Sequence, residues 1–174
     1  MSRTAAVDEN DVLLATAVWL RRKKWNIRRI SPASGQIKGE DYRIAIGRVL
    51  SNKIADQSRT ISHTLESRII ANSGPDIIAQ KDSVTWAIEC KGPDPAGTRR
   101  QEDAIASSIC EYGFDWYGIG SPVNRVGLAL PRTPAWQEFA RGWLSKELRK
   151  RLDVWILWSI PSERGFVAVA EAPG

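Results

Sequence analysis

Apolar residues recur along the chain at two spacings, one typical of helices and the other of strands. Residues 8–24 show the helical spacing between an acidic start and a basic end, which predicts a capped helix that suits the helix dipole. A second helix is predicted at 98–112, with Gly113 to end it and an inner face formed by Ala104, Ile105, Ser108, Ile109 and Tyr112. A third helix is predicted from Thr133, its N-cap, to about residue 151, with an inner stripe of Trp136, Phe139, Ala140, Trp143, Leu144 and Leu148.

Short runs of β-favouring residues lie between these helices, at 25–30, 74–80, 84–90, 125–130, 154–158 and 166–170. The polar sequence KDS between the second and third runs predicts a tight hairpin turn. The continuous apolar run at 154–158 is typical of a strand covered on both faces, and the last run is expected at a sheet edge. The alternation predicts an α/β fold in which helices flank a mixed central sheet.

The length of 174 residues suits one domain covering 1–174. Segment 38–73 could hold two helices, and its basic character makes it a candidate recognition insert. The net charge of +5 is compatible with a polyanionic partner, although many proteins without one share it. Two cysteines and one histidine argue against a disulfide framework, a zinc site and Ser/His/Asp chemistry. Without a signal peptide or an apolar stretch near the ~18 residues that span a bilayer, we expect a cytoplasmic protein with no membrane partner.

Three residues of the predicted hairpin carry the candidate chemistry. Glu89 and Lys91 stand two positions apart, so on a strand they share a face, while Val84, Trp86, Ile88 and Cys90 form an apolar row on the other face. If the two runs pair around the turn, Asp76 lies near Glu89. Two carboxylates suit Mg²⁺, for which Mn²⁺ is expected to substitute, and such an ion can activate water for phosphodiester hydrolysis while Lys91 offsets charge.

These residues resemble a known signature. Pro75-Asp76, twelve intervening residues and then Glu89-Cys90-Lys91 are similar to the PD-(D/E)xK motif of the restriction-endonuclease-like nucleases. The order of helix, three-strand meander, helix and strand over about 8–130 is also similar to that family's core. The resemblance implies a restriction-endonuclease-like fold and a Mg²⁺-dependent DNA endonuclease of restriction, junction-resolving or repair type. It also implies that Asp76 and Glu89 are metal ligands and Lys91 the catalytic lysine, and a homodimer is expected if both strands of a duplex are cut.

Some families of this group add an acidic residue on the first helix and a glutamine on the helix after the lysine. Glu9 is the candidate for the first, with Glu40 or Glu66 as alternatives if 38–73 hides the true first helix. Gln101 is the candidate for the second. Both have structural alternatives, because Glu9 also suits a helix start and Gln101 can form a capping box with Thr98.

Six cations in nine residues lie at and just after the end of the first predicted helix, and we expect them to contact nucleic-acid phosphates: Arg21, Arg22, Lys23, Lys24, Arg28 and Arg29. Their structural alternative is a solvated helix end that complements the dipole. Two other functions stay open at this point. One is a nucleic-acid-binding module that has lost catalysis on the same fold, and the other is an α/β interaction protein.

Overall fold

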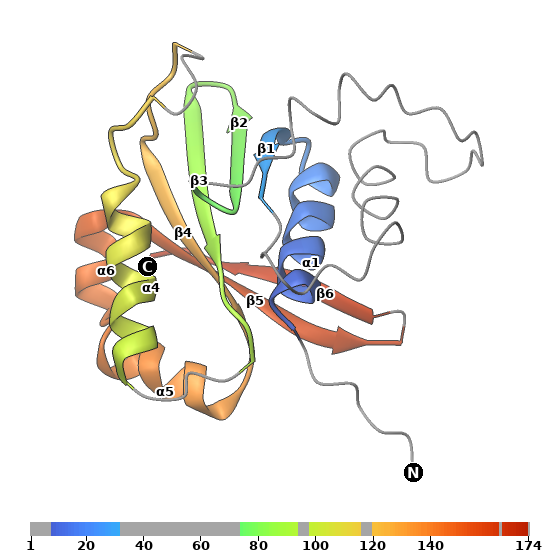
Figure 1. Cartoon of the computed structure of the whole chain (residues 1–174), viewed down its shortest axis with the longest axis vertical. Coiled ribbons are helices and arrows are strands. Elements are labelled where there is room, and N and C mark those ends of the chain that lie inside the picture. The colour runs from blue at the N-terminus through green and yellow to red at the C-terminus, as the bar shows by residue number, and fades with distance from the viewer. Residues whose placement is uncertain (1–7, 32–73, 94–97, 116–119, 164, 174) are drawn as a thin grey trace.

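The computed structural model describes residues 8–31, 74–93, 98–115, 120–163 and 165–173. These residues form a six-stranded sheet and four helices, so the predicted mixed α/β class is confirmed (Figure 1). The elements are α1 (Glu9–Arg22), β1 (Asn26–Ile30), β2 (Ile77–Lys81), β3 (Val84–Cys90), α4 (Thr98–Cys110), β4 (Arg125–Pro131), α5 (Pro134–Gly142), α6 (Lys146–Leu152), β5 (Val154–Ser162) and β6 (Gly165–Glu171).

The strands lie in sequence order across the sheet, from β1 at one edge to β6 at the other. The first three strands form an antiparallel meander, β3, β4 and β5 run parallel, and β6 returns antiparallel to β5 as the predicted edge strand. Parallel neighbours need crossover connections, which here contain α4 and the α5–α6 pair. The carboxyl ends of β3 and β4 therefore meet at the same end of the sheet.

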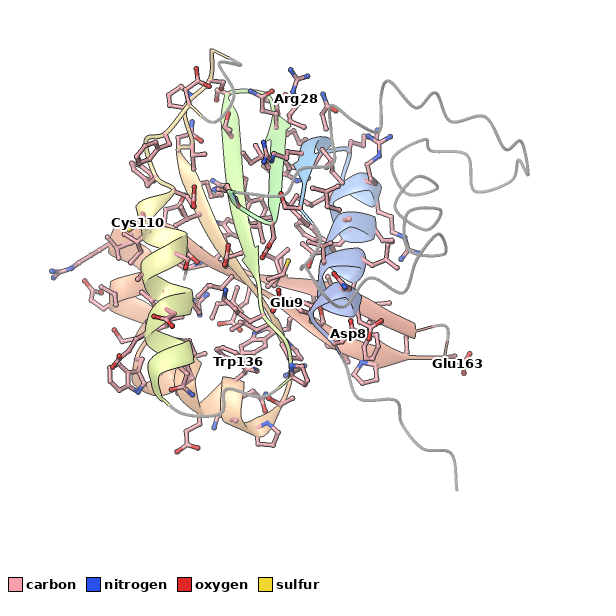
Figure 2. The ribbon with its side chains drawn as sticks, viewed as in Figure 1. Asp8, Glu9, Arg28, Cys110, Trp136 and Glu163 are labelled. Carbon is pink, nitrogen blue, oxygen red and sulfur yellow. The ribbon has the colours of Figure 1, made fainter. Side chains whose placement is uncertain are left out.

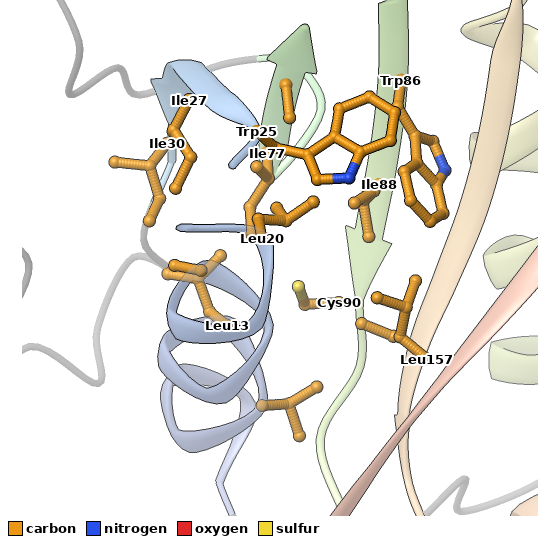
Figure 3. Close-up of a cluster of buried hydrophobic side chains, with 14 residues drawn as sticks. Leu13, Leu20, Trp25, Ile27, Ile30, Ile77, Trp86, Ile88, Cys90 and Leu157 are labelled. Carbon is orange, nitrogen blue, oxygen red and sulfur yellow. The ribbon is translucent and has the colours of Figure 1, made fainter. Parts of the chain in front are cut away.

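Two hydrophobic clusters cover the two faces of the sheet. On one face, Leu13 and Leu20 of α1 pack with Trp86, Ile88 and Cys90 of β3, which confirms the predicted apolar row on that strand (Figure 3). On the other face, α4 and α5 pack against β4 and β5 through a second cluster that includes Ala104, Leu128, Leu130, Trp136, Phe139 and Ile156. The sheet is thus enclosed between helices, and polar side chains on it cluster near strand ends.

The start of α1 is fixed by a reciprocal capping box. The Asp8 side chain accepts a hydrogen bond from the Asp11 N–H at 2.8 Å, and the Asp11 side chain accepts one from the Asp8 N–H at 3.0 Å. The predicted acidic start of this helix is therefore confirmed. It matters for function because Glu9 is the first residue of α1, so the capping box holds Glu9 in place.

The predicted helix from Thr133 to residue 151 is wrong in its middle, because the chain forms two helices there. Thr133 caps α5 as expected, but a new cap at Ser145, whose side chain accepts from the Leu148 N–H, begins α6. The break between the helices buries Leu144 and leaves Trp143 51% exposed, so Trp143 does not belong to an inner stripe.

Two more residues that were predicted to face inward from helices are exposed in the structure. The predicted inner residue Tyr112 is exposed, since α4 ends at Cys110 and the chain turns through Gly113 at φ 85°. Leu148 is also exposed, on α6. Segment 38–73 lies outside the described residues, and so do Glu40 and Glu66. No helix in the described ranges has the length and apolar content that a membrane span requires.

Candidate active site

The β2–β3 hairpin positions the two carboxylates that the sequence singles out. Its turn contains Asp82 in the left-handed conformation at φ 53°, and the register pairs Ile77 with Ile88. One step further along, Asp76 and Glu89 come beside each other, and strand alternation directs Glu89 away from the apolar row of Trp86, Ile88 and Cys90. The Asp76 Oδ2 accepts a hydrogen bond of 2.6 Å from the Cys90 N–H, which fixes this carboxylate against the end of β3.

Lys91 follows β3 directly and continues its pairing with β4, because its N–H donates to the Ala129 carbonyl at 3.0 Å. The strand alternation therefore persists for one more residue, and Lys91 shares the face of Glu89 as predicted. Its Nζ donates to Glu89 Oε1 at 2.6 Å. Both side chains are mostly buried, with 23% of Lys91 and 15% of Glu89 exposed.

Glu9 joins this group from the start of α1 (Figure 2). The Gly92 N–H donates a hydrogen bond to its carboxylate, and the charges of Lys91 and Glu89 both act on it. The approach is close, since a Cβ built on Gly92 would lie 3.8 Å from the Glu9 Cβ. The structure thus brings together Asp76, Glu89, Lys91 and Glu9. We call these four residues the carboxylate–lysine cluster.

Burial and nearby negative charge raise the pKa of two carboxyls of the cluster, Asp76 and Glu9. Burial raises the pKa of Asp76 to about 8, assisted by the negative charges of Glu89 and Glu9 and opposed by the Cys90 N–H and Lys91. Burial also raises the pKa of Glu9, and Glu89 adds to the effect. Three carboxylates share one ammonium here, so the cluster lacks the positive charge that full ionisation of its acids would require.

Lys91 responds in the opposite sense. Burial by itself would lower its pKa, but the charge and hydrogen bond of Glu89, with Asp76 and Glu9, raise it above the ordinary value. Lys91 is therefore an ammonium at neutral pH and acts through its charge. The buried Cys90 thiol is inert, because burial and the nearby carboxylates raise its pKa well above the ordinary range.

The donor chemistry of the cluster fits a hard divalent cation. Carboxylate oxygens are the ligands that Mg²⁺ prefers, and it commonly takes one or two carboxylates and keeps several waters. Asp76 and Glu89 are the pair that could hold it, with Glu9 close by. In the described ranges, no three or more Asp, Glu, His or Cys side chains converge as a ready-made metal site. Glu89 is instead paired with Lys91.

Gln101 lies on the first turns of α4 and is half-buried. Within the part of the chain that the structure describes, no hydrogen bond joins Gln101 to the carboxylate–lysine cluster. The side chain of Thr98 lies outside the described residues, so its capping box with Gln101 stays a prediction alongside the catalytic role.

The basic run lies at the other end of α1 from Glu9, as the position of Arg28 in Figure 2 illustrates. A rise of ~1.5 Å per residue puts the two ends of this 14-residue helix roughly 20 Å apart. Arg21 is half-buried, and four of the predicted phosphate contacts are exposed: Arg22, Lys23, Lys24 and Arg28.

Arg29 does not fit the predicted phosphate contact, because it is only 9% exposed. The pairing of β1 with β2 is irregular between Ile27 and Arg29, as in a β-bulge. The bulge lets both Ile27 and Ile30 pack with α1, and Arg29 is turned away from solvent.

Trp136 is a neighbour of the cluster that the sequence pattern classes only as a packing residue. It is buried on α5, and its Nε1–H donates to the Gly92 carbonyl at 3.0 Å. Gly92 thus bonds Glu9 through its N–H and Trp136 through its carbonyl. The sequence offered one chemical signal for this hydrogen bond, because the indole N–H of a buried tryptophan normally requires an acceptor.

Comparisons with protein-family models, with curated proteins and with solved structures find no match to this chain.

Proposed function

We propose that this protein is a Mg²⁺-dependent endonuclease of the PD-(D/E)xK class that hydrolyses phosphodiester bonds in DNA, with Asp76, Glu89 and Lys91 as its catalytic residues. One observation carries the proposal: the partly buried carboxylates of Asp76 and Glu9 lie within electrostatic reach of Glu89 and Lys91, and the Lys91 ammonium is hydrogen-bonded to Glu89. Burial and repulsion leave these acids short of positive charge, and a divalent cation would supply it.

The residues of the chain have distinct roles in this proposal. Asp76 and Glu89 would hold the cation, with Glu9 as a further oxygen donor, and the Cys90 N–H orients Asp76 beforehand. When bound, such a cation neutralises charge on a scissile phosphate and lowers the pKa of a bound water. Lys91 keeps its proton, so it stabilises negative charge that develops at the reacting phosphate and does not act as a base.

The order of elements supports the same proposal. Helix α1, the meander β1–β2–β3, helix α4 and strand β4 follow the order that the resemblance to restriction-endonuclease-like nucleases implies. Asp76 precedes the second strand of the meander, and Glu89 lies near the end of the third, as the motif requires. We therefore also propose that the chain has the restriction-endonuclease-like fold.

DNA is the proposed substrate because exposed cations lie within reach of a bound duplex. The distance from Glu9 to the exposed cations is about the length of α1, and these cations are Arg22, Lys23, Lys24 and Arg28. A duplex segment of ~20 Å, which would span this distance, carries roughly a dozen phosphates. One cluster per chain cuts one strand at a time, so we expect a homodimer if the enzyme cuts both strands.

The test is cleavage of supercoiled plasmid, branched DNA and RNA in Mg²⁺ or in EDTA. We expect Mg²⁺-dependent cutting of DNA that falls by about 100-fold or more in Asp76→Asn and in Lys91→Ala, since both change groups at the reacting centre. Asp82→Asn and Lys150→Ala are matched controls at exposed positions and should cut normally. Undiminished cutting by the two cluster variants, or no Mg²⁺-dependent cutting of any substrate, would overturn the proposal.

One observation favours a second candidate, a nucleic-acid-binding module that has lost catalysis. Glu89 is already neutralised by Lys91 at 2.6 Å, which reduces its availability as a metal ligand. That candidate predicts salt-sensitive DNA binding without cleavage in Mg²⁺ or Mn²⁺. The same cleavage assay, run beside a binding titration, separates the two.

A further inference from the structure

A cavity of about 570 Å³ is lined by residues of α5 and α6, by Arg132 directly after β4, by Trp158 in the middle of β5 and by the end of β6. Its volume is within the range of small-ligand sites in proteins. It does not include any residue of the carboxylate–lysine cluster. The polar and aromatic side chains that line it are Arg132, Gln137, Arg141, Lys146, Trp158 and Glu171, with the buried Arg149 behind them.

The cavity has one carboxylate, and that carboxylate is already bonded. Arg149 donates to Glu171 Oε1, and the Trp158 Nε1–H donates to Oε2 at 2.7 Å. Burial would raise the pKa of Glu171, but these hydrogen bonds and the charge of Arg149 lower it. Arg149 is buried and also donates to the carbonyls of Glu171 and Ala172, so its position is fixed and its charge is balanced by the half-exposed Glu171 carboxylate.

Three cations at the cavity remain without such a partner. Arg132, Arg141 and Lys146 are exposed, and within the described part of the chain none of them forms an ion pair. They come from three different segments, namely the end of β4, α5 and α6. The charge of Arg132 also acts on Glu171, but this one carboxylate faces four cations when Arg149 is included, so the cavity carries an excess of about three positive charges.

The remaining lining defines what else a ligand would need. Trp158, Leu144 and Ala140 form the apolar part of the lining, with 8% of Trp158 and 1% of Leu144 exposed, and Gln137 offers an amide that can both donate and accept. Two guanidinium groups and an ammonium match the oxygens of a phosphate, which arginine binds through two parallel hydrogen bonds. An apolar wall beside a phosphate site suits a phosphate attached to a flat organic group.

We propose that this cavity binds a phosphorylated ligand of nucleotide size, with its phosphate held by Arg132, Arg141 and Lys146 and its organic part against Trp158. The phosphate belongs either to a free mononucleotide or to the 5′-phosphorylated end of a nucleic-acid strand. The site is independent of the proposed nuclease reaction, because it uses none of the residues of the cluster.

The test measures binding of inorganic phosphate, AMP, and a short oligonucleotide with or without a 5′-phosphate, by calorimetry on the full chain in EDTA. The double variant Arg141→Gln/Lys146→Gln removes two exposed charges from the cavity and should leave the fold intact, which a thermal melt checks. The matched control is Lys150→Gln/Arg151→Gln. It also removes two exposed charges, both from helix α6, but neither residue lines the cavity.

We expect saturable binding of a phosphorylated probe, weakened about tenfold or more in the cavity variant and within about twofold of wild type in the control. Equal binding of AMP and the phosphorylated oligonucleotide would identify a free nucleotide as the ligand, and preference for the oligonucleotide would identify a strand end. Absence of saturable binding of every phosphorylated probe at millimolar concentration, or equal loss in both double variants, would overturn the proposal. Cleavage activity is measured separately, so either proposal can fail alone.

Discussion

Replacing Asp76 by asparagine should make the stability of the metal-free protein less sensitive to pH. The pKa of Asp76 is about 8 in the folded state, against an ordinary value of 3.8. Between these values the folded protein holds a proton that the unfolded chain has released. Its contribution to stability is therefore complete below pH 3.8 and is lost as the pH rises towards 8.

The magnitude follows from the linkage slope. One proton difference corresponds to ~1.4 kcal/mol per pH unit, so this group alone costs the wild type roughly 3 kcal/mol of unfolding free energy between pH 5 and pH 7. Asparagine cannot release a proton, and its side-chain oxygen can still accept from the Cys90 N–H. The stability of Asp76→Asn relative to wild type should therefore rise by about 3 kcal/mol over that interval.

Urea unfolding followed by tryptophan fluorescence, in EDTA at pH 5, 6 and 7, measures this difference. Asp82→Asn is the matched control, because Asp82 is exposed in the hairpin turn and asparagine tolerates its left-handed backbone. A stability difference between Asp76→Asn and wild type that stays constant with pH, or that changes equally in the control, would show that Asp76 does not have a raised pKa in the folded protein.

Two further predictions concern the core. Gly127→Ala should lower the free energy of unfolding in urea by about 1–3 kcal/mol, because its Cβ would lie 2.6 Å from Nε1 of the buried Trp86 ring. The control Gly142→Ala should change it little, because a Cβ there would meet nothing within 4 Å. Equal effects would contradict that account. Arg149→Met should lower the free energy of unfolding by roughly 2–4 kcal/mol in the same measurement. This loss is smaller than that expected for breaking a fully buried ion pair, because the carboxylate partner on β6 is 51% exposed. Arg151→Met, at an exposed pair, should stay within about 0.5 kcal/mol, and a cost like that of Arg149→Met would show that burial is not the cause.

The hairpin at the centre of the site was predictable because its signals are local. Strand alternation places Glu89 and Lys91 on one face and the apolar row on the other, and a short polar turn sets the register that brings Asp76 beside Glu89. The capped start of α1 was equally local, since Asp8 and Asp11 lie within one turn. In each case the residues that decide the structure are close in sequence.

What the sequence did not predict depends on distant packing. The resemblance named Glu9 as a candidate but left Glu40 and Glu66 open, because no short pattern encodes the contact of α1 with Gly92 that brings Glu9 into the cluster. The break between α5 and α6 is decided by burial of Leu144, and the inward turn of Arg29 by a bulge in the pairing of β1 with β2. The buried Arg149 looks, in sequence, like any basic residue at a helix end.

Anomalous diffraction from crystals soaked in millimolar Mn²⁺ can detect directly whether the carboxylate–lysine cluster binds a divalent cation, as the proposed reaction requires. We expect an anomalous peak within ~2.5 Å of a carboxylate oxygen of both Asp76 and Glu89, and its loss in Asp76→Asn. No peak at the cluster, or an unchanged peak in the variant, would contradict the account.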